Sequence, residues 1–336
     1  MTRHVVLVTY GEPPDASFFD QLVYSWRILL GLTLSVAPIP KYVLPVIALK
    51  RAYSRNRLWS EEKYQSPLES ITRNQMEDVT EALERLAPGE DWRVRAAYEF
   101  RDPLLADVLK KLPGNEPITI VPMYAVESAF THEISRRTAE LVRANGRSAP
   151  IRALGAIDEE TFAEICAKHV IEECEKRGAR GKDWALVLAA HGTLMNPPRP
   201  METGRVATER IAEAIARRLE GRFGTIELAW LNHVYGGQWT EPSAEDALAG
   251  ISNEGFKRLV YFPFGFLADN AESELEGRIA IRTRAWMEVY QLPCVNDSEA
   301  LADALSRQVM EASGIAAPRP AIAAAVAEPR NVILRL

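Results

Sequence analysis

Two apolar runs decide the fold of this chain, and each of them ends in polar side chains. The first is Trp184-Ala-Leu-Val-Leu-Ala-Ala190, which is followed by His191-Gly192. The second is Leu259-Val-Tyr-Phe-Pro-Phe-Gly-Phe266, which leads into acidic residues at 269, 272, 274 and 276. Runs of this length predict buried parallel strands, and open α/β sheets bind ligands beyond the carboxyl ends of such strands. An imidazole facing a carboxylate there could bind a divalent cation or take up protons, so the sequence points to metal chemistry.

The first half of the chain echoes this arrangement. Val5-Val-Leu-Val-Thr9 runs into Tyr10-Gly11 as the later strand runs into His191-Gly192, and Ile118-Thr-Ile-Val-Pro122 resembles the run that ends at Pro263. Helical periodicity separates the strands, at Glu77–Leu86, Pro103–Leu112 and Val206–Leu219. This alternation predicts an α/β fold with two similar Rossmann-like domains, in which helices flank parallel sheets and a cleft lies between the domains.

The turn residues of Asn145-Gly-Arg-Ser-Ala-Pro150 suggest where the domains divide. We expect an N-terminal α/β domain over 1–150, which includes a lip segment, and a C-terminal α/β domain over 151–313. The stretch 314–336 is rich in Ala and Pro and is typical of a tail.

The composition is that of a globular protein, with 336 residues, 47% hydrophobic and 26% charged. A net charge of −6 argues against a nucleic-acid partner, which requires a basic face. The three cysteines, Cys166, Cys174 and Cys294, form no CxxC pair, so we expect neither an iron–sulfur cluster nor another tightly bound cofactor.

The apolar stretch Leu22–Leu49 is interrupted by Arg27, Lys41 and several prolines, so a membrane-spanning helix is not expected. Residues 28–49 fit two alternatives, a peripheral membrane contact or a pair of buried helices joined by a Pro-rich turn. A strand begins within the first residues and leaves no room for a signal peptide, so we expect a cytoplasmic monomer.

Four residues near the second-half strands are candidates for the chemistry. His191 ends a strand, where a ligand or a general base is favoured over a satisfied core histidine. Asp269, Glu272 and Glu276 would share one face of a helix, where a cation or transferred protons would offset their repulsion. The alternative is the usual enrichment of acids in the first turn of a helix.

Candidates in the first half carry weaker signals. Tyr10 occupies the position that His191 occupies in the second half, and a phenol there could face a ligand or cap the core. Arg27 could bind a carboxylate, and Trp59 could offer a flat face to an aromatic ligand. Ser66 and His132 complete the set, and for each residue a structural role is the common alternative.

Several known signatures are absent from the sequence. No GxGxxG follows the first strand, and neither a GxxxxGK[ST] phosphate loop, a GxSxG elbow nor an HExxH motif occurs. Dinucleotide binding, P-loop phosphate binding, α/β-hydrolase chemistry and zinc-protease chemistry are therefore not supported.

The motifs together resemble the ferrochelatase family. They are Leu-Val-Thr-Tyr10-Gly-Glu-Pro, Tyr64-Gln-Ser66-Pro-Leu-Glu-Ser-Ile-Thr72-Arg-Asn-Gln75, Val-Pro122-Met-Tyr, Ala-Ala-His191-Gly and Phe-Leu-Ala-Asp269-Asn-Ala-Glu272, in family order from residue 5 to about 310. The resemblance implies two Rossmann-like domains around a porphyrin cleft, and insertion of Fe²⁺, as a substrate, into protoporphyrin IX or coproporphyrin III in haem biosynthesis.

The resemblance also implies residue roles. His191 and Glu272 would be the catalytic and metal-binding pair. The mechanism that we expect at this pair adds Asp269 and Glu276 as relays of protons or metal. The porphyrin substrate and the haem product would be bound by residues of the first half, which are Tyr10, Arg27, Trp59, Ser66 and His132.

Some stretches depart from the family pattern. Pro200-Met-Glu-Thr-Gly204 replaces a Gly-Asp-Pro-Tyr segment, and the loop 231–239 replaces a Gln-Ser-Arg stretch. Two alternatives therefore stay open. One is a cobalt or nickel chelatase acting on another tetrapyrrole, and the other is a non-catalytic haem-binding carrier or sensor on a chelatase fold.

Overall fold

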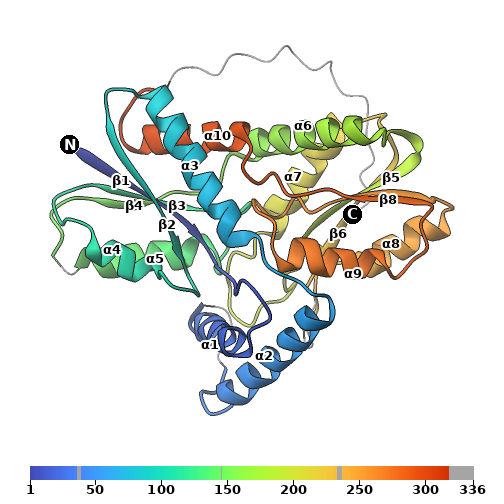
Figure 1. The fold of residues 1–336 in the computed structure, drawn as a ribbon, viewed down its shortest axis with the longest axis horizontal. Coiled ribbons are helices and arrows are strands. Elements are labelled where there is room, and N and C mark those ends of the chain that lie inside the picture. The colour runs from blue at the N-terminus through green and yellow to red at the C-terminus, as the bar shows by residue number, and fades with distance from the viewer. Residues whose placement is uncertain (36–38, 145, 233–236, 318–336) are drawn as a thin grey trace. The chain divides into compact units, whose positions relative to one another are not determined.

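The computed structural model describes residues 1–35, 39–144, 146–232 and 237–317 (Figure 1). The chain divides into two compact units. Unit 1 comprises Met1–Ala156, Pro197–Thr203 and Asp297–Ala317, and unit 2 comprises Ile157–Asn196 and Gly204–Asn296.

Unit 1 is built on a parallel sheet of four strands in the order β2-β1-β3-β4. The strands are β1 (Thr2–Thr9), β2 (Asp91–Tyr98), β3 (Ile118–Pro122) and β4 (Ile151–Ala153). The last six residues of β1 are buried, as expected for a central strand covered on both faces.

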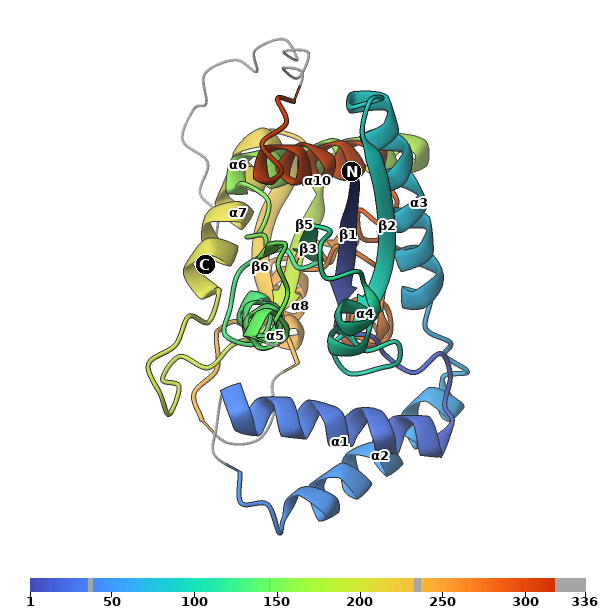
Figure 2. The ribbon, with the colours of Figure 1, turned by 90° about the vertical axis from the view of Figure 1, so that its left-hand side faces the viewer.

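Helices cover both faces of this sheet. One layer is α4 (Leu105–Lys111) with α5 (His132–Ala144), and it packs on strand residues that include Val6, Val8 and Ile120. The other layer is α3 (Leu68–Leu86) with α10 (Glu299–Ala312). Beyond the carboxyl ends of β1 and β2, α1 (Phe18–Ser35) and α2 (Leu44–Glu61) form a helical hairpin (Figure 2).

Unit 2 repeats this plan, with four parallel strands in the order β6-β5-β7-β8. They are β5 (Gly181–His191), β6 (Phe223–Leu231), β7 (Arg258–Phe262) and β8 (Glu288–Gln291). One face packs on α8 (Ala244–Asn253) and α9 (Gly277–Ile281) through small and branched side chains such as Ala189 and Leu248. The helices α6 (Glu159–Arg177) and α7 (Arg205–Arg218) complete the unit, and a short π-helix, η1 (Ala271–Glu276), precedes α9.

Both units therefore have the same strand order, in which the first strand of each unit lies between the second and the third. The expected α/β fold with two similar parallel sheets flanked by helices is confirmed. The expected helices at 77–86, 103–112 and 206–219 correspond to α3, α4 and α7.

The division of the chain differs from the expected domains of 1–150 and 151–313. Helix α10 belongs to unit 1, where Ser306 Oγ donates to the Val79 carbonyl and Gln308 Nε2 donates to that of Ala156. Residues 197–203 also belong to unit 1, and the Glu202 carbonyl accepts from the Ala129 N–H. Residues 197–203 and α10 join unit 1 through long-range packing, which the turn residues near 150 could not indicate. Most of the expected tail, 318–336, lies outside the described residues.

Candidate active site at the carboxyl edge of unit 2

His191 and Glu272 form the centre of the candidate site. His191 is the last residue of β5, and Glu272 follows β7, the neighbouring strand in the sheet. Nδ1 of His191 lies 2.5 Å from Oε1 of Glu272. The side chains are 48% and 17% exposed, so the pair can be reached by a ligand. The sequence predicted that these two groups would face each other, and the structure brings them into contact.

The backbone around His191 is held on both sides. The Gly265 N–H donates to the Ala189 carbonyl, and a Cβ at Gly265 would lie 2.7 Å from the Ala190 Cα. Only glycine therefore lets this loop approach the end of β5 so closely. On the other side, Gly192 N–H donates to the Leu231 carbonyl and Thr193 accepts from the Thr240 N–H.

Glu272 is positioned by the capping of η1. The Asn270 side chain accepts from the N–H groups of Glu272 and Ser273, and Ser273 Oγ accepts from the Asn270 N–H. Both capping side chains are buried. This reciprocal cap satisfies N–H groups that a helix start would otherwise leave unpaired, and it fixes Glu272 in the first turn.

The helix that carries Glu272 is a π-helix rather than the expected α-helix. The Gly277 N–H donates to the Glu272 carbonyl, five residues earlier. Gln291 Nε2 donates to the carbonyls of Ser273 and Glu274, which the wider turn exposes. Gly277 makes room for this arrangement, since a Cβ there would lie 2.9 Å from the Tyr261 ring.

Asp269 does not share a helical face with Glu272, because it precedes the cap residue Asn270. Its Oδ1 accepts from the Cys294 N–H and its Oδ2 accepts from Asn296 Nδ2, at 2.8 and 2.7 Å. Asp269 thus ties the loop after β8 to the start of η1. Its expected role as a relay stays a prediction, as does that of Glu276, which is the half-buried last residue of η1.

Tyr10 and Arg27 lie together in unit 1. Tyr10 follows β1 and packs on a cluster formed by Tyr24, Ile28 and Phe100. Arg27 Nη2 donates to Asp102 Oδ2 at 3.0 Å, and Nη1 lies 3.5 Å from the Phe100 carbonyl. Asp102 is 72% exposed, so a ligand carboxylate could compete for this guanidinium.

Trp59 is 1% exposed and belongs to the core of unit 1. Its ring meets that of Tyr64 edge to face, with centroids 4.8 Å apart, and the Arg55 guanidinium lies over it. This arrangement offers no open flat face to an aromatic ligand, because neighbouring side chains cover the indole.

Ser66 holds a carboxylate in place. Its Oγ donates to Glu12 Oε1 at 2.5 Å, and its N–H donates to the Pro14 carbonyl. Glu12 is buried, and its other oxygen lies 3.6 Å from Arg55. The structure therefore links Ser66 to the segment that follows Tyr10.

His132 is buried at the start of α5 rather than presented to solvent. Its Nδ1 lies 3.2 Å from Thr131 Oγ1, and its ring packs near Tyr124. Burial lowers the pKa of His132 to about 4, opposed by the charge of Glu127 and reinforced by that of Arg136. His132 is thus neutral at pH 7.

Glu99 was missed by sequence reasoning. It follows β2, it is half-buried, and it accepts hydrogen bonds from Tyr124 and Ser135. Burial raises the pKa of its carboxyl to about 8, although both hydrogen bonds act in the opposite direction. The only signal in the sequence was its place directly after a strand.

The remaining expectations concern the cysteines, the loop 231–239, bound metals and membrane spans. The three cysteines are free and buried. The loop 231–239 falls partly on residues 233–236, including His233, which lie outside the described residues. Within the described part of the chain, no group of three or more His, Cys, Asp or Glu residues could hold a metal ion, and no helix is long and apolar enough to cross a membrane.

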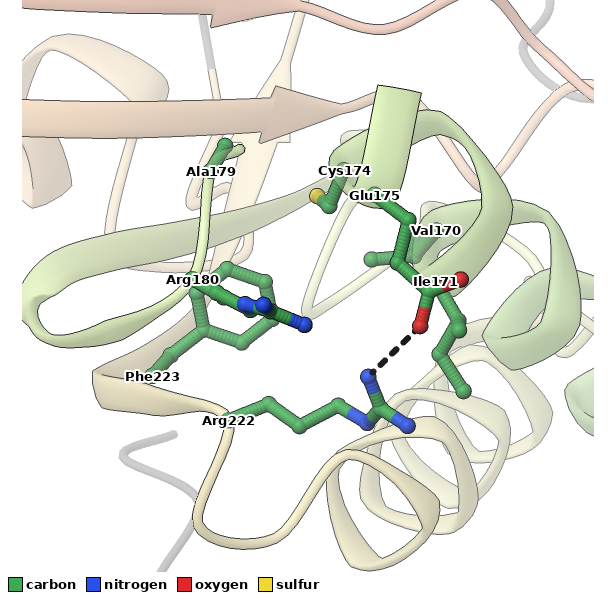
Figure 3. Close-up of a pocket in the computed structure, with 8 residues that line it drawn as sticks. All are labelled: Val170, Ile171, Cys174, Glu175, Ala179, Arg180, Arg222 and Phe223. Atoms are coloured by element: carbon green, nitrogen blue, oxygen red, sulfur yellow. Dashed lines mark ion pairs between the residues drawn. The ribbon is translucent and has the colours of Figure 1, made fainter. Parts of the chain in front are cut away.

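One cavity in unit 2 is far too small to hold a tetrapyrrole. It has a volume of about 10 Å³ and is lined by residues that include Cys174, Arg180 and Phe223 (Figure 3). Glu175 and Arg222 form an ion pair at its rim. Such a volume holds about one water molecule.

Comparison with known proteins places this geometry in a family. The family model for ferrochelatase matches residues 3–313. The ferrochelatase of Bradyrhizobium diazoefficiens is 26% identical over 91% of this chain and 92% of its own length. That of Aquifex aeolicus is 22% identical over 82% of this chain and 87% of its own length.

Two solved structures share the fold. One is CbiX, the terminal enzyme for biosynthesis of siroheme in denitrifying bacteria, with a TM-score of 0.52 and 16% identity over 93% of this chain and 99% of its own. The other is DR2241 of Deinococcus radiodurans, with a TM-score of 0.50 and 17% identity over 90% of this chain and 53% of its own. These likenesses concern the fold, whereas the family model and the named relatives support a metal-chelatase activity. The chain belongs to the ferrochelatase family.

Proposed function

We propose that this protein inserts Fe²⁺ into a porphyrin, either protoporphyrin IX or coproporphyrin III, and that His191 and Glu272 carry the reaction. The observation that carries the proposal is the 2.5 Å contact between His191 Nδ1 and Glu272 Oε1 at the carboxyl edge of unit 2. Family membership supports the same class of reaction.

The reaction exchanges two ring N–H protons for one metal ion. When the Nδ1–H of His191 is donated to Glu272, Nε2 is the basic nitrogen of the imidazole. Nε2 takes a proton from a ring nitrogen, whose electron pair then binds the metal, and the Glu272 carboxylate stabilises the imidazolium that forms. Glu276, four residues after Glu272 in η1, passes the proton outward.

The same pair suits a metal that must leave. An imidazole and a carboxylate bind several first-row cations, yet two protein ligands hold a cation less firmly than the three or four of a resident zinc site. Fe²⁺ is therefore a substrate: the pair passes it to the ring nitrogens that carry no proton, and the freed Nε2 of His191 then takes the proton of a ring N–H. Stacking of the ring near Tyr10 and pairing of a propionate with Arg27 supply binding energy that offsets the distortion of the ring.

A peripheral membrane contact accompanies this function. The helical hairpin α1–α2 exposes large apolar side chains, among them Phe19, Trp26, Tyr42, Val46, Leu49 and Tyr53. Exposed Lys41 and Lys50 lie among them. Apolar side chains next to basic ones fit the surface of an anionic bilayer. Cosedimentation with anionic vesicles tests this contact, and loss of binding in a Tyr42→Ser, Val46→Ser variant is expected.

The test of the function is anaerobic Fe²⁺ insertion by the purified protein, followed by absorbance, with each porphyrin offered separately. Turnover of one porphyrin identifies the substrate. Parallel assays with Co²⁺ and Ni²⁺ and a reduced tetrapyrrole test the alternative chelatases. Tight binding of haem without insertion of any metal would contradict the proposal and favour the carrier.

A further inference from the structure

Unit 1 carries a carboxyl group at the edge that corresponds to the one bearing His191 in unit 2. Glu99 directly follows β2, and its N–H donates to the carbonyl of Thr9, the last residue of β1. The next N–H, that of Phe100, donates to the Tyr10 carbonyl, and the Phe100 carbonyl lies 3.5 Å from Arg27. Glu99 therefore lies among the residues that we propose as porphyrin contacts.

The two side chains that hydrogen-bond to the Glu99 carboxyl are hydroxyls. Tyr124 donates its hydroxyl to Oε2 at 2.8 Å, and Ser135 of α5 donates to Oε1 at 3.2 Å. Tyr24 of α1 and His132 of α5 lie near Tyr124, and His132 is itself kept neutral by burial. Other buried or half-buried carboxylates of unit 1, such as Glu12 and Glu127, lie against arginines. Glu99 instead accepts hydrogen bonds from two hydroxyl groups.

This setting changes the basicity of the group. Burial raises the pKa of the Glu99 carboxyl to about 8. A carboxylate with an ordinary pKa is a poor base for a pyrrole N–H, whereas one whose pKa lies near the working pH is matched to proton transfer. Glu99 as a whole residue is half-buried, so part of its surface is open at this edge.

We infer that Glu99 is a second acid–base residue of this protein, which takes up one of the two protons that leave the porphyrin. The inference rests on the proposed function. In the step, the ring N–H bond breaks and an O–H bond forms on the ionised Glu99 carboxyl, while the electron pair stays on the ring nitrogen and binds the metal.

The variant that isolates this role is Glu99→Gln. An amide has nearly the shape of the protonated carboxyl, and its oxygen can accept from Tyr124 or Ser135, but it cannot take up a proton. Glu116→Gln is the matched control, because Glu116 is also half-buried, pairs with His4, and precedes β3 at the opposite edge of the same sheet.

The experiment measures Fe²⁺ insertion from pH 6 to 9 at saturating porphyrin, with porphyrin affinity measured separately. We expect kcat of the wild type to rise with pH towards a plateau above about pH 8, in line with the pKa of Glu99. In Glu99→Gln we expect kcat to fall by about 100-fold and this rise to vanish, with porphyrin affinity unchanged. Glu116→Gln should behave as the wild type.

Tyr124→Phe provides a second readout. The Tyr124 hydroxyl lowers the pKa of Glu99, so its removal should move the rise in kcat to higher pH. A Glu99→Gln protein that keeps kcat within twofold of the wild type across this range, or a Tyr124→Phe profile that does not move, would overturn the inference and leave the proposed function standing. A wild-type protein that inserts no metal would refute both.

Discussion

The carboxyl edges of the two sheets differ in chemistry although the sheets share one strand order. In unit 2 the first strand ends in His191, which contacts a carboxylate presented by a capped π-helix. In unit 1 the first strand runs into Tyr10, which packs among aromatic side chains, and the carboxyl group nearby is held by hydroxyls. The same scaffold thus presents different residue types at the two edges, and the chemistry available at an edge follows from those residues rather than from the fold.

The largest effect is expected from breaking the unit 2 pair. Glu272→Gln keeps the shape of the side chain but removes the charge that stabilises the protonated imidazole, so kcat should fall by about 100-fold or more. A double variant with His191→Ala should be little worse than either single variant, because the two groups act as a unit. Additive losses in kcat would show that they act separately. His4→Gln, at the amino edge of unit 1, is the control.

The cap of η1 should matter to both stability and activity. Asn270→Ala removes the side chain that accepts from the Glu272 and Ser273 N–H groups, and should lower the free energy of unfolding by about 1–2 kcal/mol. Because Glu272 is then less firmly placed, kcat should fall as well. Urea unfolding and the insertion assay measure the two effects. Ser298→Ala, at the cap of α10, is the control, and it should lower stability without a loss of kcat.

In unit 1, Glu99→Gln should stabilise the protein in neutral and alkaline solution. The folded state holds the Glu99 proton up to about pH 8, whereas the unfolded chain releases it near 4.5. Stability therefore falls as pH rises between these values. Removing the acid should yield about 1–2 kcal/mol near pH 8, after allowance for the partial exposure of the side chain, and little near pH 4.5. An equal gain at both pH values would contradict the raised pKa.

The smallest effect on stability is expected for Arg27→Ala. Its ion pair with the exposed Asp102 contributes less than about 1 kcal/mol. If unit 1 binds the propionates, however, the KM for porphyrin should rise several-fold while kcat stays nearly constant. Arg93→Ala, on the same sheet but paired with Asp91 near the amino end of β2, should change neither. A fall in kcat alone would contradict a binding role for Arg27.

The comparison also shows what the sequence could and could not predict. Apolar runs ending in Tyr10 and His191 predicted two parallel sheets, and the positions of His191 and Glu272 after two apolar runs predicted that the two groups would face each other. That they are in direct contact, after neighbouring strands, comes from the structure. The π-helix was not predicted, because its hydrogen bonds span five residues instead of four, and a stretch of only six residues shows no distinct side-chain pattern for this difference. Asp269 was expected on the same helical face as Glu272, but it precedes the cap. Its hydrogen-bond partners, Cys294 and Asn296, are remote in the sequence, so local spacing could not indicate its position.

Burial that arises only in the folded chain explains the other differences. Trp59 and His132 carry side chains that could serve a ligand, but tertiary packing places both in the core. The raised pKa of Glu99 likewise depends on α5 and the end of β3, neither of which adjoins it in the sequence. Helix α10 belongs to unit 1 because it packs on α3. This was not predicted, since its partners on α3 lie more than two hundred residues earlier in the sequence.

The most direct test of the central claim is anaerobic Fe²⁺ insertion by the wild type and by His191→Ala, with porphyrin binding measured on the same samples. The account predicts that the wild type forms the iron porphyrin, and that His191→Ala binds the porphyrin with similar affinity but inserts iron at least 100 times more slowly. Insertion by His191→Ala at a rate near that of the wild type would contradict the assignment of the chemistry to the edge of unit 2.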